Sequence, residues 1–282
     1  MSTAITQRIQ ENYSTGALVE RVKQGLEKAG SGSGPLRWSD LVPFDQFHVC
    51  GLEATKELAN DLNLKSGQSV LDVGSGLGGP ARYLAAVHEV NVTGIDLTPS
   101  FIEISNYLSE RAGLTDKLIF TEGDATELPF PDDTFDVVWT QHVSMNIEDK
   151  ARLYKGFHRV LRAGGRLAVF DAIQGSNGPV LYPTPWAREE AISFIVSEKG
   201  MTDALTEAGF KNLSVIDKTE RGARWFRELR QQREQQQKAE TAPDPLSALF
   251  ILGPGMTPAI GNFARNVLED RVHIVQIIAE KA

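Results

Sequence analysis

The chain has 282 residues, of which 41% are hydrophobic and 23% charged, and its 37 acidic and 29 basic residues give a net charge of −8. This composition is that of a globular protein, and the negative charge disfavours broad electrostatic binding to nucleic acid or to an anionic membrane. No stretch of the sequence approaches the roughly 20 apolar residues that span a bilayer, and a single cysteine, Cys50, excludes an internal disulfide framework or a multi-cysteine zinc site.

The N-terminal part predicts a helical extension over residues 1–48, which we expect to cover an active site. Within it, residues 5–29 fit one or two helices, and the Gly/Ser-rich stretch 30–35 predicts a loop. A helical pattern at 49–62 then opens the main domain. The N-terminus lacks the basic start and apolar core of a signal peptide, so a cytoplasmic location is expected.

Beyond residue 65, short apolar strand patterns alternate with helical patterns. Strands separated by helices of about 10–15 residues predict βαβ units and a parallel sheet with helices on both faces. We expect the helix at 148–162 to end in a left-handed cap at Ala163-Gly164-Gly165. The predicted strands are 69–73, 90–95, 117–121, 134–139, 166–171, 212–217 and 271–279, and further helices are 99–112, 200–208, 258–269 and one starting near Pro80.

The fold class that follows is α/β, a Rossmann-like, seven-stranded, mostly parallel sheet with an N-terminal helical extension and a lid insertion. The main domain is taken as 49–282, with lid segments over a ligand site near 181–190 and 220–260. In the second segment arginines recur every third residue from Arg221 to Arg233, interleaved with glutamates. That pattern predicts a solvated helix face or a lid, with a contact in a homodimer as a further interpretation.

The stretch VLDVGSGLGG at 70–79 carries the strongest chemical signal. A strand leads directly into glycines and then a helix, so Gly74 and Gly76 let the backbone turn tightly and approach a ligand closely. Asp96 ends the next strand, where a carboxylate binds ribose hydroxyls. The same glycine spacing also fits a nicotinamide dinucleotide site, so a nicotinamide-dependent oxidoreductase stays an alternative on this loop alone.

Polar residues at the ends of three strands separate these alternatives. Asp72 lies two residues before Gly74, where it would repel a pyrophosphate and attract a cationic amino-acid group. Asp124 follows the third strand, within reach of a nucleobase amine, and Gln141 and His142 end the fourth. Because the carboxyl ends of parallel strands meet at one edge of the sheet, these side chains are expected to share one crevice.

Together these motifs make residues 65–171 resemble a class I S-adenosylmethionine-dependent methyltransferase. The resemblance implies S-adenosyl-L-methionine as cofactor and S-adenosyl-L-homocysteine as product. The same fold also carries aminopropyl transfer and non-catalytic subunits. The cofactor-binding residues expected from the electrostatics and the resemblance are Asp72, Gly74, Ser75, Gly76, Asp96, Leu97, Gly123, Asp124, Ala125 and Gln141.

Several of these positions also have a plain structural interpretation. Gly79 suits close helix packing better than ligand contact, and Asp124 fits an ordinary turn residue. Leu97 and Phe101 fit the core as well as a cofactor face. His48 and Cys50 have no third ligand near them, so no metal site is predicted, and Cys50 fits an inert small hydrophobe.

Outside the cofactor half, the sequence resembles small-molecule N-methyltransferases that act on sarcosine and dimethylglycine. The matching stretches are FDQFHVCGLEAT at 44–55, GSGLGGPARYLA at 74–85 and LYPTPWA at 181–187. This resemblance implies a small soluble amine as the methyl acceptor. Proteins with similar motifs methylate other amines, sterols, phenols or thiols, so O-, S- and C-methyl transfer stay open, as does a ligand-binding protein without activity.

The acceptor type decides which residues are needed. An amine becomes a cation on methylation and favours aromatic faces, whereas a phenol or thiol needs a base. A substrate carboxylate would need a cation, with Arg188 and Arg224 as candidates. His48 and His142 are the candidate bases or positioning residues, although both also fit buried structural histidines. The expected substrate-contacting residues are Phe44, Phe47, His48, His142, Tyr182 and Trp186.

Overall fold

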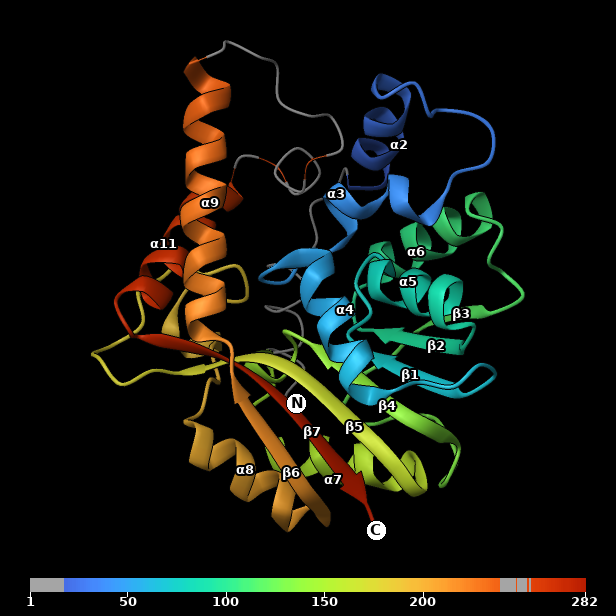
Figure 1. Cartoon of the computed structure of the whole chain (residues 1–282), viewed down its shortest axis with the longest axis vertical. Coiled ribbons are helices and arrows are strands. Elements are labelled where there is room, and N and C mark those ends of the chain that lie inside the picture. Colours follow the sequence, from blue (N-terminus) through green and yellow to red (C-terminus); the bar gives the residue numbers. More distant parts are fainter. Residues whose placement is uncertain (1–17, 239–246, 248–252, 254) are drawn as a thin grey trace.

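A seven-stranded sheet forms the centre of the computed structural model, which describes residues 18–238, 247, 253 and 255–282 (Figure 1). The strand order is β3-β2-β1-β4-β5-β7-β6, with β7 antiparallel to both of its neighbours and the remaining pairs parallel. The predicted fold class is confirmed. The strands are β1 Ser69–Val73, β2 Asn91–Asp96, β3 Leu118–Glu122, β4 Phe135–Gln141, β5 Leu161–Gln174, β6 Phe210–Asp217 and β7 Val272–Lys281.

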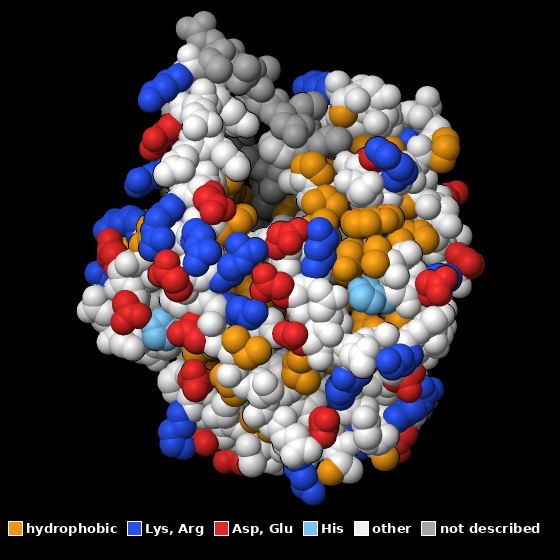
Figure 2. Space-filling model, in the orientation of Figure 1, with side chains coloured by type: hydrophobic (Ala, Val, Ile, Leu, Met, Phe, Trp, Pro, Cys, Tyr) orange, Lys and Arg blue, Asp and Glu red, His pale blue; other side chains and the backbone are white. Residues whose placement is uncertain are grey.

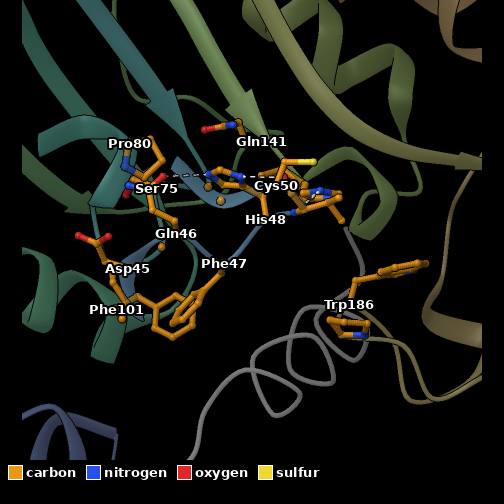
Figure 3. A pocket seen from close by; sticks show the side chains of 18 of the residues that line it. Asp45, Gln46, Phe47, His48, Cys50, Ser75, Pro80, Phe101, Gln141 and Trp186 are labelled. Atoms are coloured by element: carbon orange, nitrogen blue, oxygen red, sulfur yellow. Dashed lines mark hydrogen bonds between the residues drawn. The ribbon is translucent and has the colours of Figure 1, made fainter. Parts of the chain in front are cut away.

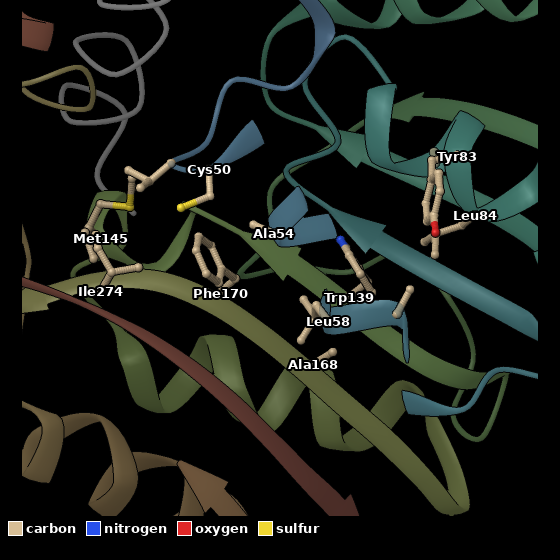
Figure 4. Packing of buried hydrophobic residues seen from close by; sticks show 14 of the residues in the cluster. Cys50, Ala54, Leu58, Tyr83, Leu84, Trp139, Met145, Ala168, Phe170 and Ile274 are labelled. Carbon is tan, nitrogen blue, oxygen red and sulfur yellow. The ribbon is translucent and has the colours of Figure 1, made fainter. Parts of the chain in front are cut away.

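Helices cover both faces of this sheet. Those on one face include α4 and α5, which bury Leu58 and Leu84, while α7 and α8 bury Phe157 and Leu205 on the other. Figure 4 shows the first face, where Leu58 packs near Trp139 of β4 and Ala168 and Phe170 of β5. The helices are α2 Leu18–Lys28, α3 Val42–Asp45, α4 Gly51–Leu62, α5 Gly79–His88, α6 Pro99–Arg111, α7 Lys150–Val160, α8 Glu198–Glu207, α9 Thr219–Lys238 and α11 Met256–Leu268, and the short 3₁₀ turns are Trp38–Asp40, Ser144–Asn146 and Glu190–Ile192.

The junction of α7 and β5 differs from the expected helix cap. α7 ends at Val160, and Leu161 is already extended and paired with Phe135 of β4. Leu161 is fully buried, so this apolar side chain favours strand pairing over another helical turn. The predicted cap at Ala163-Gly164-Gly165 is therefore wrong. Gly164 does adopt a left-handed φ of 72°, but within an irregularity of the β4–β5 ladder.

The N-terminal helices pack on the sheet domain through a separate apolar cluster, called here the N-terminal cluster. α2 lies against α6, and α3 lies against α5. The prediction of helix over 5–29 is confirmed for α2, and residues 5–17 lie outside the described residues. The N-terminal cluster comprises Leu18, Val22, Leu26, Leu36, Leu41, Phe44, Leu77, Phe101, Ile104 and Leu108.

The predicted insertion between the last two strands is present. α9 and α11 lie between β6 and β7 in the chain, contact each other and both contact β7. In Figure 1 they stand on the opposite side of the sheet's upper edge from α2 and α3. The face in Figure 2 shows basic and acidic side chains interspersed over the sheet and the lower part of α9. Among the helices of the described residues, none is both long and apolar enough for a bilayer crossing.

Candidate active site

A cavity of about 930 Å³ lies where the strand-end loops meet the N-terminal segment and the insertion helices. One half of its wall comes from the loops that follow β1, β2, β3 and β4. The other half comes from residues 42–53, the loop at Pro185 and Trp186, and helices α9 and α11. Figure 3 shows His48 and Gln141 near the middle, with Asp45 and Phe101 on one side and Trp186 on the other.

The glycine loop after β1 is held against β2 and presents backbone to the cavity. The N–H groups of Gly74 and Ser75 donate to the Ile95 carbonyl at 2.8 and 3.1 Å. Gly74 and Gly76 have φ of 72° and 52°, which favour glycine. A Cβ at Gly74 would lie 2.2 Å from Val143 Cγ2, whereas a Cβ at Gly76 would meet nothing within 4 Å. The open side at Gly76 is where a ligand can contact the backbone.

Gly79 serves packing, as one sequence interpretation proposed. A Cβ there would lie 2.2 Å from the Asp45 carbonyl oxygen, so α5 approaches α3 too closely for any other residue. Asp45 also forms a buried ion pair with Arg82 of α5 at 2.9 Å, and Arg82 donates a second bond to the Leu77 carbonyl at 2.6 Å. The N-terminal segment is thus fixed to the helix that follows the glycine loop.

Two aspartates lie beside the glycine loop. Asp96 accepts the Gly76 N–H on Oδ2 and the Thr98 N–H on Oδ1, both at 2.9 Å. Asp72 is 2% exposed, and its Oδ2 has no hydrogen-bond partner among the described residues. Burial, with the nearby Asp96 carboxyl as a second cause, raises the pKa of Asp72 to about 8. A cationic group in the cavity would supply the missing partner.

The turn after β3 adjoins Asp96. The Gly123 N–H donates to the Asp96 carbonyl at 3.0 Å, and Asp124 Oδ1 accepts the backbone N–H and the hydroxyl of Thr126, both at 2.8 Å. Asp124 therefore stabilises its own turn, which agrees with its interpretation as a turn residue, and it also lines the cavity. Gly123, Ala125, Leu97 and Phe101 line the cavity as well, and Phe101 belongs at the same time to the N-terminal cluster.

Gln141 lies at the carboxyl end of β4 and faces the centre of the cavity. Its Oε1 accepts from the Trp139 indole N–H at 3.1 Å and from the Thr55 hydroxyl at 3.3 Å. Those two bonds fix the orientation of the amide. Nε2 has no partner among the described residues, which leaves a buried donor at the wall of the cavity.

His48 is held by polar neighbours at the same place. Its Nε2 lies 3.1 Å from Gln46 Oε1 and 3.1 Å from Thr55 Oγ1, and the single hydroxyl proton of Thr55 is shared between Gln46 Oε1 at 2.9 Å and Gln141 Oε1 at 3.3 Å. Burial lowers the pKa of His48 to about 4. The ring is therefore neutral at pH 7, and both partners of Nε2 already come from the protein.

His142 lines the cavity next to His48, with ring centroids 6.4 Å apart and planes at 16°. Its Nε2 accepts the Val49 N–H at 3.3 Å, so the neutral ring carries its proton on Nδ1, which lies 4.0 Å from Asp171 Oδ1. Burial, together with His48, lowers the pKa of His142 to about 3. Both predicted histidines thus meet in the cavity as neutral rings.

The predicted aromatic residues divide into two groups. Phe47 and Trp186 line the cavity, and the Trp186 indole N–H donates to Ser193 Oγ at 2.9 Å. Phe44 and Tyr182 do not line it, and their assignment as substrate contacts is corrected. Phe44 is fully buried in the N-terminal cluster, because it lies within α3 whereas Phe47 follows that helix. Tyr182 packs against the core on the α4 and α5 face of the sheet.

Several residues that line the cavity or position its side chains are absent from the sequence prediction. Gln46 and Thr55 position His48, while Phe226, Leu229 and Arg233 of α9 face the cavity. For α9 the signal was present, because positions 226, 229 and 233 follow helical spacing. Arg188 and Arg224, the predicted partners of a substrate carboxylate, do not line the cavity.

The cavity wall contains histidine and carboxylate side chains as well as the thiol of Cys50. The described part of the chain contains no group of three or more His, Cys, Asp or Glu side chains that could hold a metal ion. Cys50 lines the cavity, but burial raises the pKa of its thiol to about 11. At pH 7 it is a neutral thiol and a poor nucleophile.

Comparison with known proteins identifies the domain. Residues 71–169 match the family model described as a methyltransferase domain. Phosphoethanolamine N-methyltransferase 1 of Arabidopsis thaliana is 31% identical over 188 residues, which cover 67% of this chain and 38% of that protein. The chain thus spans less than half the length of this curated relative.

Two solved structures share the fold at low sequence identity. Phosphoethanolamine N-methyltransferase 2 of Haemonchus contortus, in complex with phosphomonomethylethanolamine and S-adenosylhomocysteine, has a TM-score of 0.74 at 17% identity, covering 97% of this chain and 60% of its own. A provisionally assigned sarcosine dimethylglycine methyltransferase from Galdieria sulphuraria has a TM-score of 0.67 at 18% identity, covering 82% and 86%. The resemblance predicted from the sequence is confirmed: residues 71–169 form a methyltransferase domain, and the chain is related to S-adenosylmethionine-dependent small-molecule methyltransferases.

Proposed function

We propose that this chain transfers a methyl group from S-adenosyl-L-methionine to a small molecule, and that the acceptor atom is an amine nitrogen. The cofactor half of the proposal is carried by Asp72, a buried carboxyl without a counter-ion beside an open glycine loop. This arrangement suits the cationic amino group of the cofactor. It is less suited to a nicotinamide dinucleotide, because a pyrophosphate supplies no cation to stabilise the ionised form of Asp72.

The other cofactor contacts follow from the same geometry. Gly76 exposes its backbone, and Gln141 Nε2 is a buried donor for a carboxylate or a polar atom near the sulfur. Asp96 already accepts two backbone N–H groups, but each carboxylate oxygen keeps a second lone pair for a ribose hydroxyl. Asp124, Ala125 and Leu97 line the same cavity, which supports their assignment to the adenine.

Methyl transfer requires positioning more than proton chemistry when the acceptor is an amine. S-adenosyl-L-methionine supplies a methyl group on a positively charged sulfur, and a neutral amine displaces that sulfur in line and becomes a cation. Trp186, Phe226 and Phe263 lie in one edge-to-face cluster at the acceptor end of the cavity. Each face turned toward the new cation would stabilise it by about 0.5–2 kcal/mol.

The lowered pKa values of His48 and His142 favour an amine over a phenol or hydroxyl as the methyl acceptor. A phenol or hydroxyl acceptor needs a base poised near neutrality, whereas the pKa values of His48 and His142 are lowered to about 4 and 3. Their Nε2 atoms are also engaged by Gln46, Thr55 and the Val49 N–H. Neutral rings add no positive charge that would repel the methylated amine.

One observation supports a second candidate, O-methylation with His142 as base. Asp171 is fully buried, and its Oδ1 lies 4.0 Å from His142 Nδ1, where it would stabilise an imidazolium. A hydroxyl acceptor would then displace the Val49 N–H from His142 Nε2. The two candidates differ in how strongly the rate depends on His142.

The test of the proposed function is calorimetry followed by turnover. S-adenosyl-L-homocysteine is expected to bind and NAD is not. Pools of amines, phenols and thiols incubated with methyl-labelled cofactor should then give labelled amines. Binding of NAD without S-adenosyl-L-homocysteine would overturn the methyltransferase proposal, and labelling confined to phenols or thiols would replace the amine with the second candidate.

Replacing His142 by asparagine is expected to lower kcat less than about tenfold with an amine acceptor, because no proton transfer passes through the ring. Asparagine tolerates the left-handed backbone at this position, where φ is 54°. The rate should follow the ionisation of the amine itself between pH 6 and 9. A loss of about 100-fold or more would instead identify His142 as a general base. His48→Gln is the matched control in the same cavity.

A further inference from the structure

One face of α9 lines the cavity and changes from apolar to charged along its length. Phe226, Leu229, Arg233 and Gln236 are three or four residues apart, so they share a face, and all four line the cavity. Each residue rises about 1.5 Å, which places Arg233 about 10 Å further along the helix than Phe226. The cavity wall therefore has an aromatic end and a cationic end.

The aromatic end adjoins the proposed site of methyl transfer. Phe226 packs edge to face on Phe263 at 5.3 Å, and Phe263 packs on Trp186 at 4.9 Å and on His142 at 5.9 Å. His142 follows Gln141 directly at the end of β4. An acceptor atom near these rings is thus close to the cofactor loops.

Arg233 is the arginine of α9 that lines the cavity, whereas Arg224, which also lacks an acidic partner among the described residues, is exposed and does not line it. Arg221 pairs with Glu57, Arg227 with Glu220, and Arg230 with Glu234. Within the described part of the chain, Arg233 has no acidic partner. Partial burial lowers its pKa, but a guanidinium stays protonated at pH 7.

Acidic side chains also line the cavity, but none that the structure describes pairs with Arg233. Asp45 is paired with Arg82 and Glu53 with Lys56. The other acidic lining residues, Asp72, Asp96 and Asp124, belong to the strand ends and the loops after them, whereas Arg233 lies on α9 and forms no ion pair with any described residue. Its planar guanidinium suits two parallel hydrogen bonds to an oxyanion. The cavity therefore offers an unfilled anion-binding group about two helical turns from its aromatic end.

We propose that Arg233 binds an oxyanion of the methyl acceptor, which makes the acceptor an amphipathic molecule with the methylated atom and an apolar body at one end and a carboxylate or phosphate at the other. The proposal rests on the proposed function and narrows its substrate class. The separation of the two ends corresponds to an apolar spacer of about 10 Å, the rise between Phe226 and Arg233.

The experiment measures binding of matched probes to the full chain saturated with S-adenosyl-L-homocysteine. Calorimetry compares octanoate, octyl phosphate and 1-octanol, which share a chain and differ in the end group. The wild-type protein should bind at least one of the two anions about tenfold more tightly than the alcohol, as expected for a hydrogen-bonded charge pair at a partly exposed site. Whichever anion binds more tightly identifies the end group.

Variants assign that preference to the side chain. Arg233→Gln should remove the preference for the anion while leaving the affinity for 1-octanol unchanged, and Arg233→Lys should keep part of it. Arg230→Gln is the matched control, because Arg230 lies on the same helix and pairs with Glu234. Its anion preference should equal that of the wild type.

The outcomes are separable from those of the proposed function. Equal binding of all three probes by the wild type, no binding of any of them, or an anion preference that survives in Arg233→Gln would each overturn the role of Arg233. A loss of S-adenosyl-L-homocysteine affinity in Arg233→Gln would also overturn it, because the arginine would then serve the cofactor. Failure of the wild type to bind S-adenosyl-L-homocysteine would instead count against the methyltransferase function.

Discussion

Replacing Asp72 by asparagine is expected to stabilise the ligand-free protein and to weaken its affinity for S-adenosyl-L-homocysteine about 10- to 100-fold. The carboxyl is buried without a counter-ion, so the folded protein disfavours its charged form. Asparagine has nearly the same shape and no charge. The stabilisation and the loss of affinity share one cause, since the site is built for a cation that the ligand supplies.

The stability effect has a defined pH dependence. The pKa of Asp72 rises from 3.8 in the unfolded chain to about 8 in the folded protein, so the folded state holds the extra proton between these values. Wild-type stability therefore falls as pH rises from about 4 to 8 through this group, and the asparagine variant lacks that decline. Urea unfolding at pH 5 and 8.5 should show a gap between the two proteins that widens by about 2–4 kcal/mol.

Binding of S-adenosyl-L-homocysteine should release the proton that Asp72 holds in the ligand-free protein. At pH 7 the ligand's ammonium group requires an ionised Asp72, so wild-type binding releases about one proton and Asp72→Asn releases none. Calorimetry in phosphate and in Tris detects the difference, because the two buffers absorb protons with different heats. A heat independent of buffer in the wild type would contradict this assignment. Asp203→Asn on α8, whose carboxylate is exposed and pairs with Lys199, is the control.

Replacing Arg82 by methionine is expected to lower the free energy of unfolding by about 3–5 kcal/mol, because it leaves the buried Asp45 carboxylate without its counter-ion. The Leu77 carbonyl also loses its donor. Urea denaturation followed by circular dichroism measures the change. Adding Asp45→Asn to the same protein should recover part of the loss, since the uncompensated charge is then removed.

A surface ion pair provides the contrast for Arg82. Lys199 and Asp203 pair on α8 with exposed side chains, so Lys199→Met should change stability by less than about 1 kcal/mol. If Arg82→Met also cost less than that, the Asp45–Arg82 pair would not be what fixes the N-terminal segment to α5. The buried pair and the exposed pair thus separate burial from charge pairing as the source of the effect.

The sheet and the glycine loop could be predicted from the sequence because their signals are local. Alternating strand and helix patterns specify βαβ units, and the glycines after β1 occur where backbone with φ of 72° and 52° requires them. The prediction of the helix end was wrong because helix and strand were both possible for the same few residues. Gly164 looked like a helix cap, but the buried Leu161 three residues earlier had already entered the β4–β5 ladder.

The acceptor half was harder to predict because its contacts join distant parts of the chain. The Val49 N–H reaches His142 across 93 positions, and Thr55 reaches Gln141 across 86. Nothing local in the sequence shows that Nε2 of His142 is occupied or that burial makes the ring neutral. Phe44 and Phe47 differ by three residues, yet α3 ends at Asp45, so helical spacing does not relate the directions of their side chains.

The position of the α9–α11 insertion has a consequence for how substrate range can change. β6 and β7 are hydrogen-bonded neighbours, so the chain leaves the sheet at Asp217 and returns at Val272 without altering strand order or register elsewhere. Phe226 and Phe263 of the insertion belong to the same apolar core as Ile274 of β7, so we expect a replacement that keeps those contacts to leave the loops after β1, β2 and β3 in place. The wall of the cavity formed by α9 and α11 could then be exchanged while the wall formed by the strand-end loops stays constant.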